Sequence, residues 1–233
     1  MAAEPGTGHA RTTEYRFLVL IASLFTGTLV ISNVVAVKIS DFGGHYLDSG
    51  NIVFPVSYIL GDVLTEVYGY RQARKIIWSA FLANALAVGV IVAAGELPAA
   101  PFWTDQESYD AILGQTWRIV GASFVAFLVG EFANSAVLAR MKVATKGRFL
   151  WMRTIGSTLV GQALDSVLFV SIAFAGTGVP ELHVLIWETW AFKVAFEVIA
   201  TPITYIVVGW LKRAEGVDAY DEDVSLNPVL VWQ

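Results

Sequence analysis

The first apolar segment of the chain reads FLVLIASLFTGTLVISNVVAVK and occupies residues 17–38. It carries no charged side chain before Lys38. A helix needs about 20 mostly apolar residues to cross the hydrocarbon core of a bilayer, so this segment predicts a membrane-spanning helix. It is too long for the apolar core of a signal peptide and no clear cleavage site follows it, so we expect it to be retained.

Other segments of the chain have a similar length and apolar character. They lie near residues 52–70, 73–94, 117–139, 154–175 and 185–211. The first of these is the weakest, because its apolar part ends at Gly61 and is followed by Asp62 and Glu66. The pattern predicts an all-α, polytopic membrane protein, with a bundle of six transmembrane helices over residues 17–213 between an N-terminal tail (1–16) and a C-terminal tail (214–233).

The composition also indicates a largely lipid-embedded chain. Of the 233 residues 56% are hydrophobic and 15% are charged, whereas soluble domains carry roughly a quarter charged residues. Cysteine is absent, which removes thiolate metal sites and cysteine nucleophiles. Several acids lie close together in the C-terminal tail and predict a solvated acidic run. They are Glu215, Asp218, Asp221, Glu222 and Asp223.

Lysine and arginine gather in alternate loops. All but three of the 15 basic residues lie before the first span, between the second and third, between the fourth and fifth, or after the sixth. Because cytoplasmic loops are enriched in Lys and Arg, we expect a cell (inner) membrane protein with both termini in the cytoplasm. The same distribution offers no basic face for nucleic acid. The longest outer loop, 96–116, alternates acids with aromatic residues and predicts a segment along the interface or, as the alternative, a lid.

Carboxylates inside the predicted spans are the informative residues. Among them are Asp62, Glu66, Glu131, Asp165 and Glu197. A charge at mid-bilayer costs at least about 2.5–3.5 kcal/mol, so such residues normally face the interior of a bundle or a water-filled path. Lys193 lies four residues before Glu197, on the same helical face, where the two could pair. Asp62, Glu66 and Asp165 have no cation on the same predicted helix.

Three of the predicted helices share a pattern of glycine followed by polar residues. The segments are GDVLTE (61–66), GEFANS (130–135) and GQALDS (161–166). Offsets of three and four residues put the polar groups on one helical face, and glycine lets a neighbouring backbone approach closely. Helix packing needs no ionised group, so we expect the stripes to converge on a binding site. The candidate substrate-binding residues are Asn33, Asp62, Glu66, Glu131, Asn134, Gln162, Asp165, Lys193 and Glu197.

Several ligands suit a site of carboxylates and amides with few cations. A flat heterocycle rich in N–H donors fits, because a carboxylate accepts two parallel hydrogen bonds from a guanine-like edge. A ligand with an amine, transported protons and a metal cation are the alternatives. No cofactor or resident metal is predicted.

At these residues the sequence resembles the queuosine-precursor transporter family, also called the vitamin uptake transporter family. The motifs that carry the resemblance are Ser32-Asn33 with Lys38, Phe54-Pro55, 61–69, 130–135, 153–158, Gly161-Gln162 with Asp165-Ser166, and Lys193 with Glu197, Thr201-Pro202 and Tyr205. The resemblance implies a six-helix importer of 7-deazaguanine precursors, such as the 7-cyano and 7-aminomethyl compounds, used to make queuosine in tRNA.

Other functional classes have weaker support. No HExxH motif exists, and His9, His45 and His183 lie in predicted tails or loops, so a zinc hydrolase or a Ser–His dyad lacks its parts. Asp62 and Asp165 could formally form an intramembrane aspartyl protease, and a cation channel is a further alternative. No Walker-type phosphate loop is present. Transport would therefore use an ion gradient, equilibration, or energising subunits, as in energy-coupling-factor importers with their six-helix binding subunits. A homo-oligomer is a further alternative.

Overall fold

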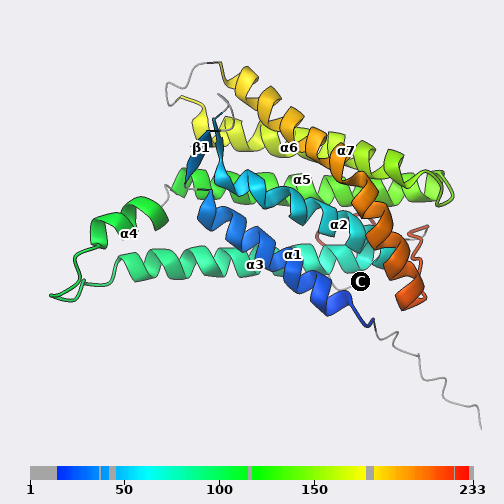
Figure 1. The fold of residues 1–233 in the computed structure, drawn as a ribbon, viewed down its shortest axis with the longest axis horizontal. Coiled ribbons are helices and arrows are strands. Elements are labelled where there is room, and N and C mark those ends of the chain that lie inside the picture. Colours follow the sequence, from blue (N-terminus) through cyan, green and yellow to red (C-terminus); the bar gives the residue numbers. More distant parts are fainter. Residues whose placement is uncertain are drawn as a thin grey trace, which may run out of the picture.

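The computed structural model describes residues 15–36, 38–41, 46–114, 117–176, 181–222 and 224–230. Within these ranges the chain is helical apart from one small hairpin (Figure 1). The helices are α1 (Leu18–Val35), α2 (Phe54–Tyr68), α3 (Tyr70–Gly95), α4 (Gln106–Leu113), α5 (Trp117–Ala144), α6 (Leu150–Phe174) and α7 (Leu182–Glu215). Strands β1 (Ile39–Asp41) and β2 (Tyr46–Asp48) pair antiparallel and are followed by a 3-10 turn, Ser49–Ile52. The predicted tail 1–16 lies outside the described residues except for Tyr15 and Arg16.

Five helices are long and apolar enough to cross a membrane: α1, α3, α5 from Gly121, α6 and α7. These confirm five of the predicted spans. The remaining segment forms α2, which has 15 residues and is therefore only about 22 Å long at a rise of 1.5 Å per residue. Every residue of α2 from Gly61 to Tyr68 is buried. The count of six spans is thus not confirmed, because the polar second segment packs inside the bundle as a shorter helix.

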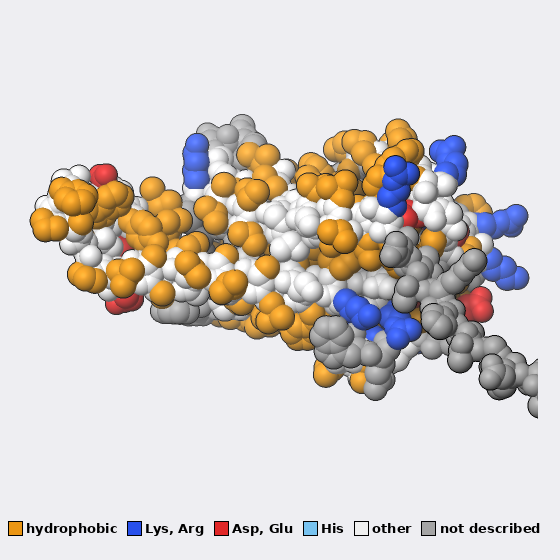
Figure 2. Space-filling model, turned by 90° about the horizontal axis from the view of Figure 1, so that it is seen from below, with side chains coloured by type: hydrophobic (Ala, Val, Ile, Leu, Met, Phe, Trp, Pro, Cys, Tyr) orange, Lys and Arg blue, Asp and Glu red, His pale blue; other side chains and the backbone are white. Residues whose placement is uncertain are grey.

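The connections between the long helices lie at two ends of the molecule. Figure 1 shows the start of α1, the junction of α2 with α3, the α5–α6 loop and the end of α7 at one end, and the hairpin and α4 at the other. Lysine and arginine side chains gather at the first end, which we call the basic end, while hydrophobic side chains cover much of the face in view (Figure 2). The alternation predicted from the loop charges is therefore present in the structure.

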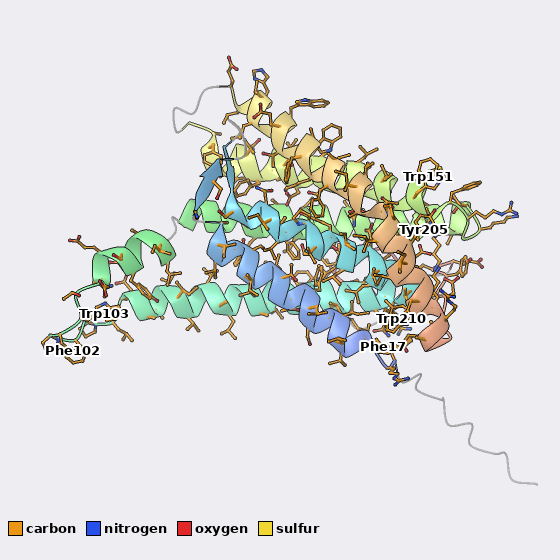
Figure 3. The ribbon with its side chains drawn as sticks, viewed as in Figure 1. Phe17, Phe102, Trp103, Trp151, Tyr205 and Trp210 are labelled. Carbon is orange, nitrogen blue, oxygen red and sulfur yellow. The ribbon has the colours of Figure 1, made fainter. Side chains whose placement is uncertain are left out.

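Aromatic side chains lie at both ends of the bundle. Phe17, Trp151, Tyr205 and Trp210 lie toward the basic end, and Phe102 and Trp103 lie beside the turn before α4 (Figure 3). Trp151 donates its backbone N–H to the Tyr205 hydroxyl over 3.0 Å. Helix α4 has no buried residue. Aromatic residues at two levels are typical of the interfaces between membrane and water.

Helices α5 and α6 approach each other at two glycines. A Cβ on Gly130 would lie 2.8 Å from Asp165 Cβ and 3.0 Å from the carbonyl oxygen of Gly161. A Cβ on Gly161 would lie 2.7 Å from Asn134 Cβ and 2.9 Å from the carbonyl oxygen of Gly130. Only glycine fits at these distances, so the predicted close approach is confirmed. It places Asp165 beside Gly130 and Asn134 beside Gly161, so the two polar side chains lie about one helical turn apart along the interface.

The end of the chain is docked on the bundle: Asp218 and Glu222 are exposed, as expected for a solvated acidic run, but Asp221 is partly buried. We call residues 216–230 the C-terminal segment. Its Asp221 carboxylate accepts the backbone N–H of Tyr70 over 2.9 Å. Arg74 donates to the carbonyl oxygens of Ser225 and Asn227, over 2.9 and 2.8 Å. Composition predicted solvation because it does not show that α3 offers these donors. Asp223 lies outside the described residues.

Candidate functional site

Polar side chains from α2, α5, α6 and α7 gather inside the bundle, and we call them the central cluster. None of them is more than 8% exposed. They are Tyr58, Asp62, Glu131, Asn134, Thr158, Gln162, Asp165, Ser166, Lys193 and Glu197. Of the residues predicted as a site, only Asn33 and Glu66 lie elsewhere.

Two contacts tie the cluster together across helices. Asn134 of α5 donates its amide N–H to Asp62 Oδ1 of α2 over 2.7 Å. Lys193 of α7 forms an ion pair with Asp165 of α6, and its ammonium nitrogen lies 5.2 Å from the centroid of the Phe54 ring. The suggested pair of Lys193 with Glu197 does not form in the part of the chain that the structure describes. The neighbouring helix supplies a carboxylate closer than the one on α7 itself.

Many polar atoms of the cluster are buried without a hydrogen-bond partner among the described residues. They are Tyr58 Oη, Asp62 Oδ2, both carboxylate oxygens of Glu131, Asn134 Oδ1, Thr158 Oγ1, both amide atoms of Gln162, Ser166 Oγ and Glu197 Oε1. Nearly all buried polar groups in folded proteins have a partner, and leaving one without costs about 1–3 kcal/mol. Such a concentration of open donors and acceptors is typical of a site that is completed by a ligand.

The cluster also has more carboxylates than cations. The charge of Glu131 interacts with those of Asp165 and Glu197. Its side chain is fully buried and lies against α2, where a Cβ on Gly61 would be 2.1 Å from Oε1. Buried ionised groups are stable only when paired or hydrogen-bonded. Chemically, this arrangement can accept N–H donors or a positive group from a ligand, or it can hold protons.

Glu66 belongs to the same stripe of α2 but forms an ion-pair network at the basic end. Arg153 donates to its two carboxylate oxygens over 2.7 and 3.3 Å. Lys212 donates to Oε1 over 2.7 Å, and Lys142 Nζ lies 3.5 Å from the same oxygen. Asp218 of the C-terminal segment pairs with both lysines. The Glu66 carboxylate is therefore paired with the protein's own cations, and these ion pairs join α2 to α5, α6 and α7.

The C-terminal segment adds charge to this network. Partial burial opposes the ionisation of Asp218, but hydrogen bonds from Lys142 and Lys212 outweigh it and lower the pKa of this carboxyl below its ordinary value. Lys142 Nζ also lies 4.7 Å from the centroid of the Tyr220 ring. Asp218 and Tyr220 of the C-terminal segment therefore pack against the Glu66 network at the basic end.

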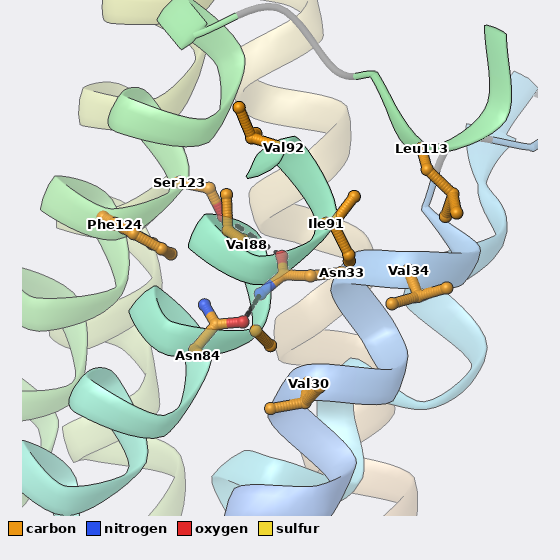
Figure 4. Close-up of a pocket in the computed structure, with 11 residues that line it drawn as sticks. Val30, Asn33, Val34, Asn84, Val88, Ile91, Val92, Leu113, Ser123 and Phe124 are labelled. Carbon is orange, nitrogen blue, oxygen red and sulfur yellow. Dashed lines mark hydrogen bonds between the residues drawn. The ribbon is translucent and has the colours of Figure 1, made fainter. Parts of the chain in front are cut away.

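Asn33 lies in a separate pocket between α1, α3 and α5 (Figure 4). Its amide donates to Asn84 Oδ1 over 3.1 Å, and Ser123 donates to Asn33 Oδ1 over 3.3 Å. The remaining lining is apolar: Val30, Val34, Ala87, Val88, Ile91, Val92, Leu113 and Phe124. The structure therefore does not bring Asn33 to the central cluster.

Sequence reasoning did not include every residue of these two sites. Arg153 was assigned to a cytoplasmic loop, but it lies inside α6 and is 1% exposed. Thr158 was not predicted either; it lies four residues before Gln162, so helical spacing back from the predicted stripe is the signal that would have found it. Tyr58 was a candidate for stacking from the sequence and was not among the predicted site residues.

Comparison with known proteins identifies the family. Residues 48–207 match the family described as "Putative vitamin uptake transporter". A probable queuosine precursor transporter of Bacillus subtilis is 30% identical over 181 residues, which cover 76% of this chain and 78% of the relative. The queuosine precursor transporter of Escherichia coli is 25% identical over 166 residues, 71% of this chain and 72% of the relative.

A third relative, a probable queuosine precursor transporter of Haemophilus influenzae, is 28% identical over 152 residues, 65% of this chain and 60% of the relative. No solved structure matches the chain. The family match covers most of the chain, including the four helices that build the central cluster. The resemblance seen in the sequence motifs is thus confirmed: the chain belongs to the vitamin uptake transporter family and is a multi-pass membrane transporter, not an enzyme.

Proposed function

We propose that the protein imports queuosine precursors, 7-cyano-7-deazaguanine, 7-aminomethyl-7-deazaguanine or both, for tRNA modification, and that the central cluster binds them. The observation that carries this proposal is the set of buried, unpartnered donors and acceptors contributed by α2, α5, α6 and α7. The names of the relatives supply the substrate class.

Glu131 and Gln162 suit the two hydrogen-bonding edges of a deazaguanine. Both oxygens of Glu131 are unpartnered, and a carboxylate can accept two parallel N–H bonds from the ring N–H and the exocyclic amine. The amide of Gln162 lies close to the Tyr58 hydroxyl; its donor and acceptor atoms have no other partner among the described residues, and they suit the ring carbonyl and a neighbouring N–H. The hydroxyl of Tyr58 interacts electrostatically with Glu131 and Asp165. The aromatic ring of this residue offers a face for stacking.

The other predicted residues have supporting functions in this proposal. Asn134 orients Asp62, and Lys193 orients Asp165, through the contacts described above. Glu66 holds the basic end together and does not contact the ligand, because three cations already surround it. Asn33 also lies outside the ligand site.

We place the basic end on the cytoplasmic side, with both termini inside the cell. The Lys and Arg side chains gathered there support this orientation, since positive residues are retained on the cytoplasmic side of the membrane. A ligand would then enter from the end that carries the hairpin and α4 and leave past the Glu66 network.

The proposal is tested by uptake of labelled 7-deazaguanines into liposomes that contain only the purified chain. We expect saturable uptake, and we expect Glu131→Gln to abolish it while membrane insertion is retained. The matched control is Glu188→Gln, which changes an exposed glutamate on α7 and should leave uptake unchanged. Absence of saturable uptake, both with the chain alone and with added energising subunits, would contradict the proposal.

A further inference from the structure

The central cluster has more negative charge than its own lysine neutralises. Lys193 is paired with Asp165, which leaves three carboxylates: Asp62, Glu131 and Glu197. Among the described residues, the Tyr58 hydroxyl also faces this group, and the charge of Glu66 acts on Asp62 from the next turn of α2.

The surrounding helices do not supply the missing positive charge. Helix α1 has no titratable side chain between Leu18 and Val35. Apart from Arg118 in the first turn of α5, whose side chain lies outside the described part of the chain, the cations of α3, α5 and α6 lie at the basic end, where Lys142 and Arg153 are already paired with Glu66. Whatever balances the three carboxylates of the cluster therefore comes from outside these helices, as a ligand or as protons.

Asp62 lies on α2 and Glu197 on α7, two helices that contact each other, and the charges of the two carboxylates interact. They are 1% and 2% exposed. One oxygen of Asp62 accepts a hydrogen bond from Asn134, but its Oδ2 has no partner, and neither has Glu197 Oε1. The pair thus offers two open carboxylate oxygens in a place that excludes water.

Two neighbouring carboxylates in such an environment do not both ionise, so one of them retains a proton when no cation is present. An ammonium group provides the same single positive charge and up to three N–H donors. Exchange of the proton for an ammonium group keeps the net charge of the site constant. It also supplies hydrogen bonds to oxygens that otherwise have none.

We propose that Asp62 and Glu197 form an ammonium subsite beside the heterocycle site, so that the transporter prefers a ligand with a protonated amine over its neutral counterpart. Binding of this ligand displaces one proton from the pair to the solvent, while the ammonium group keeps its own protons. The inference rests on the proposed function and specifies it: 7-aminomethyl-7-deazaguanine is preferred over 7-cyano-7-deazaguanine.

Calorimetric titration of the purified wild-type protein with both compounds tests this, in two buffers that differ in ionisation enthalpy. We expect release of about one proton per 7-aminomethyl compound bound and none for the 7-cyano compound. The affinity for the amine should rise with pH by up to about tenfold per unit, because the proton competes with it. This experiment needs no variant and therefore does not depend on whether a variant folds.

Glu197→Gln removes one carboxylate of the subsite. It should weaken binding of the 7-aminomethyl compound at least about tenfold more than binding of the 7-cyano compound, since a buried charge pair is lost only with the amine, and it should remove the proton release. Glu188→Gln, on the same helix but exposed, should change neither. Equal binding of both compounds without proton release, or equal weakening of both by Glu197→Gln, would overturn the subsite. Absence of binding and uptake of either compound would instead overturn the proposed function.

Discussion

Replacement of Glu66 by glutamine should destabilise the protein far more than the same replacement of Glu131. Both side chains are fully buried and both lie on helices of the same bundle. Their surroundings differ: Glu66 contacts three cations, whereas both oxygens of Glu131 lack a hydrogen-bond partner among the described residues. The two variants therefore separate a carboxylate that stabilises the fold from one that is available to a ligand.

The size of the effect at Glu66 follows from the partners that it would leave behind. Arg153 is 1% exposed and would lose its counter-charge in a buried position, whereas Lys142 would keep its ion pair with Asp218. Removing one partner of a buried ion pair costs about 3–5 kcal/mol. In a chain of this length 1 kcal/mol shifts the melting temperature by about 2–4 °C, so we expect a decrease of roughly 6–20 °C.

Glu131→Gln should leave stability within about 1 kcal/mol of the wild type, because no ion pair is broken. Removal of a carboxylate that interacts unfavourably with Asp165 and Glu197 could even raise the melting temperature. Uptake, in contrast, should be lost, since the neutral amide cannot accept two N–H bonds from the ligand.

The assay is thermal unfolding of the purified variants in one detergent, followed by tryptophan fluorescence. All samples need the same heating rate, because unfolding of such proteins is often irreversible and the melting temperature then depends on that rate. Size-exclusion chromatography before heating confirms that each variant is folded. Equal melting temperatures for both variants, or a larger decrease for Glu131→Gln, would refute the reasoning.

Three further changes test other contacts. Gly61→Ala should lower uptake at least about tenfold, because the added Cβ would lie 2.1 Å from Glu131 Oε1 and displace that carboxylate. Arg74→Ala should release the C-terminal segment, since two hydrogen bonds to it are lost; faster amide hydrogen exchange there would show this. Lys193→Met should reduce uptake and stability because Asp165 loses its cation, and the added change Asp165→Asn should recover stability.

Matched controls accompany these changes. Gly89→Ala adds a methyl group where no atom lies within 4 Å and should leave uptake unchanged. Arg71→Ala removes an exposed arginine from the same turn of α3 and should leave hydrogen exchange of the C-terminal segment unchanged. Uptake by Gly61→Ala at the wild-type rate, unchanged exchange in Arg74→Ala, or a double variant less stable than Lys193→Met would contradict the respective contact.

The sequence was sufficient to predict the long helices and the polar faces that form the central cluster. A bilayer requires about 20 apolar residues with internally satisfied backbone groups, so α1 and α3 are visible as uninterrupted apolar runs. The stripes that begin at Gly130 and Gly161 predicted the polar face of α5 and α6, because helical spacing is a local property of the chain. Helix α2 was predicted too long, since length alone does not show that a segment is enclosed by other helices.

The choice of partners could not be predicted in the same way. Lys193 has an acid four residues along its own helix, but it pairs with Asp165 of α6. Glu66 was predicted as a ligand contact. Only the packing of α6 against α2 shows that Arg153 donates to both of its carboxylate oxygens. Asp221 was predicted to be solvated because its hydrogen-bond donor, the backbone N–H of Tyr70 in α3, is remote in the sequence.

By itself, then, the sequence determined the membrane environment, the long helices and the polar face of each, because apolar length and helical periodicity are properties of neighbouring residues. Only the tertiary structure decided which carboxylates are neutralised by the protein and which stay open to a ligand. Glu66 and Arg153 are 87 residues apart in the chain, and an ion pair forms according to distance in space. The difference between Glu66 and Glu131 therefore arises from the packing of α2, α5, α6 and α7.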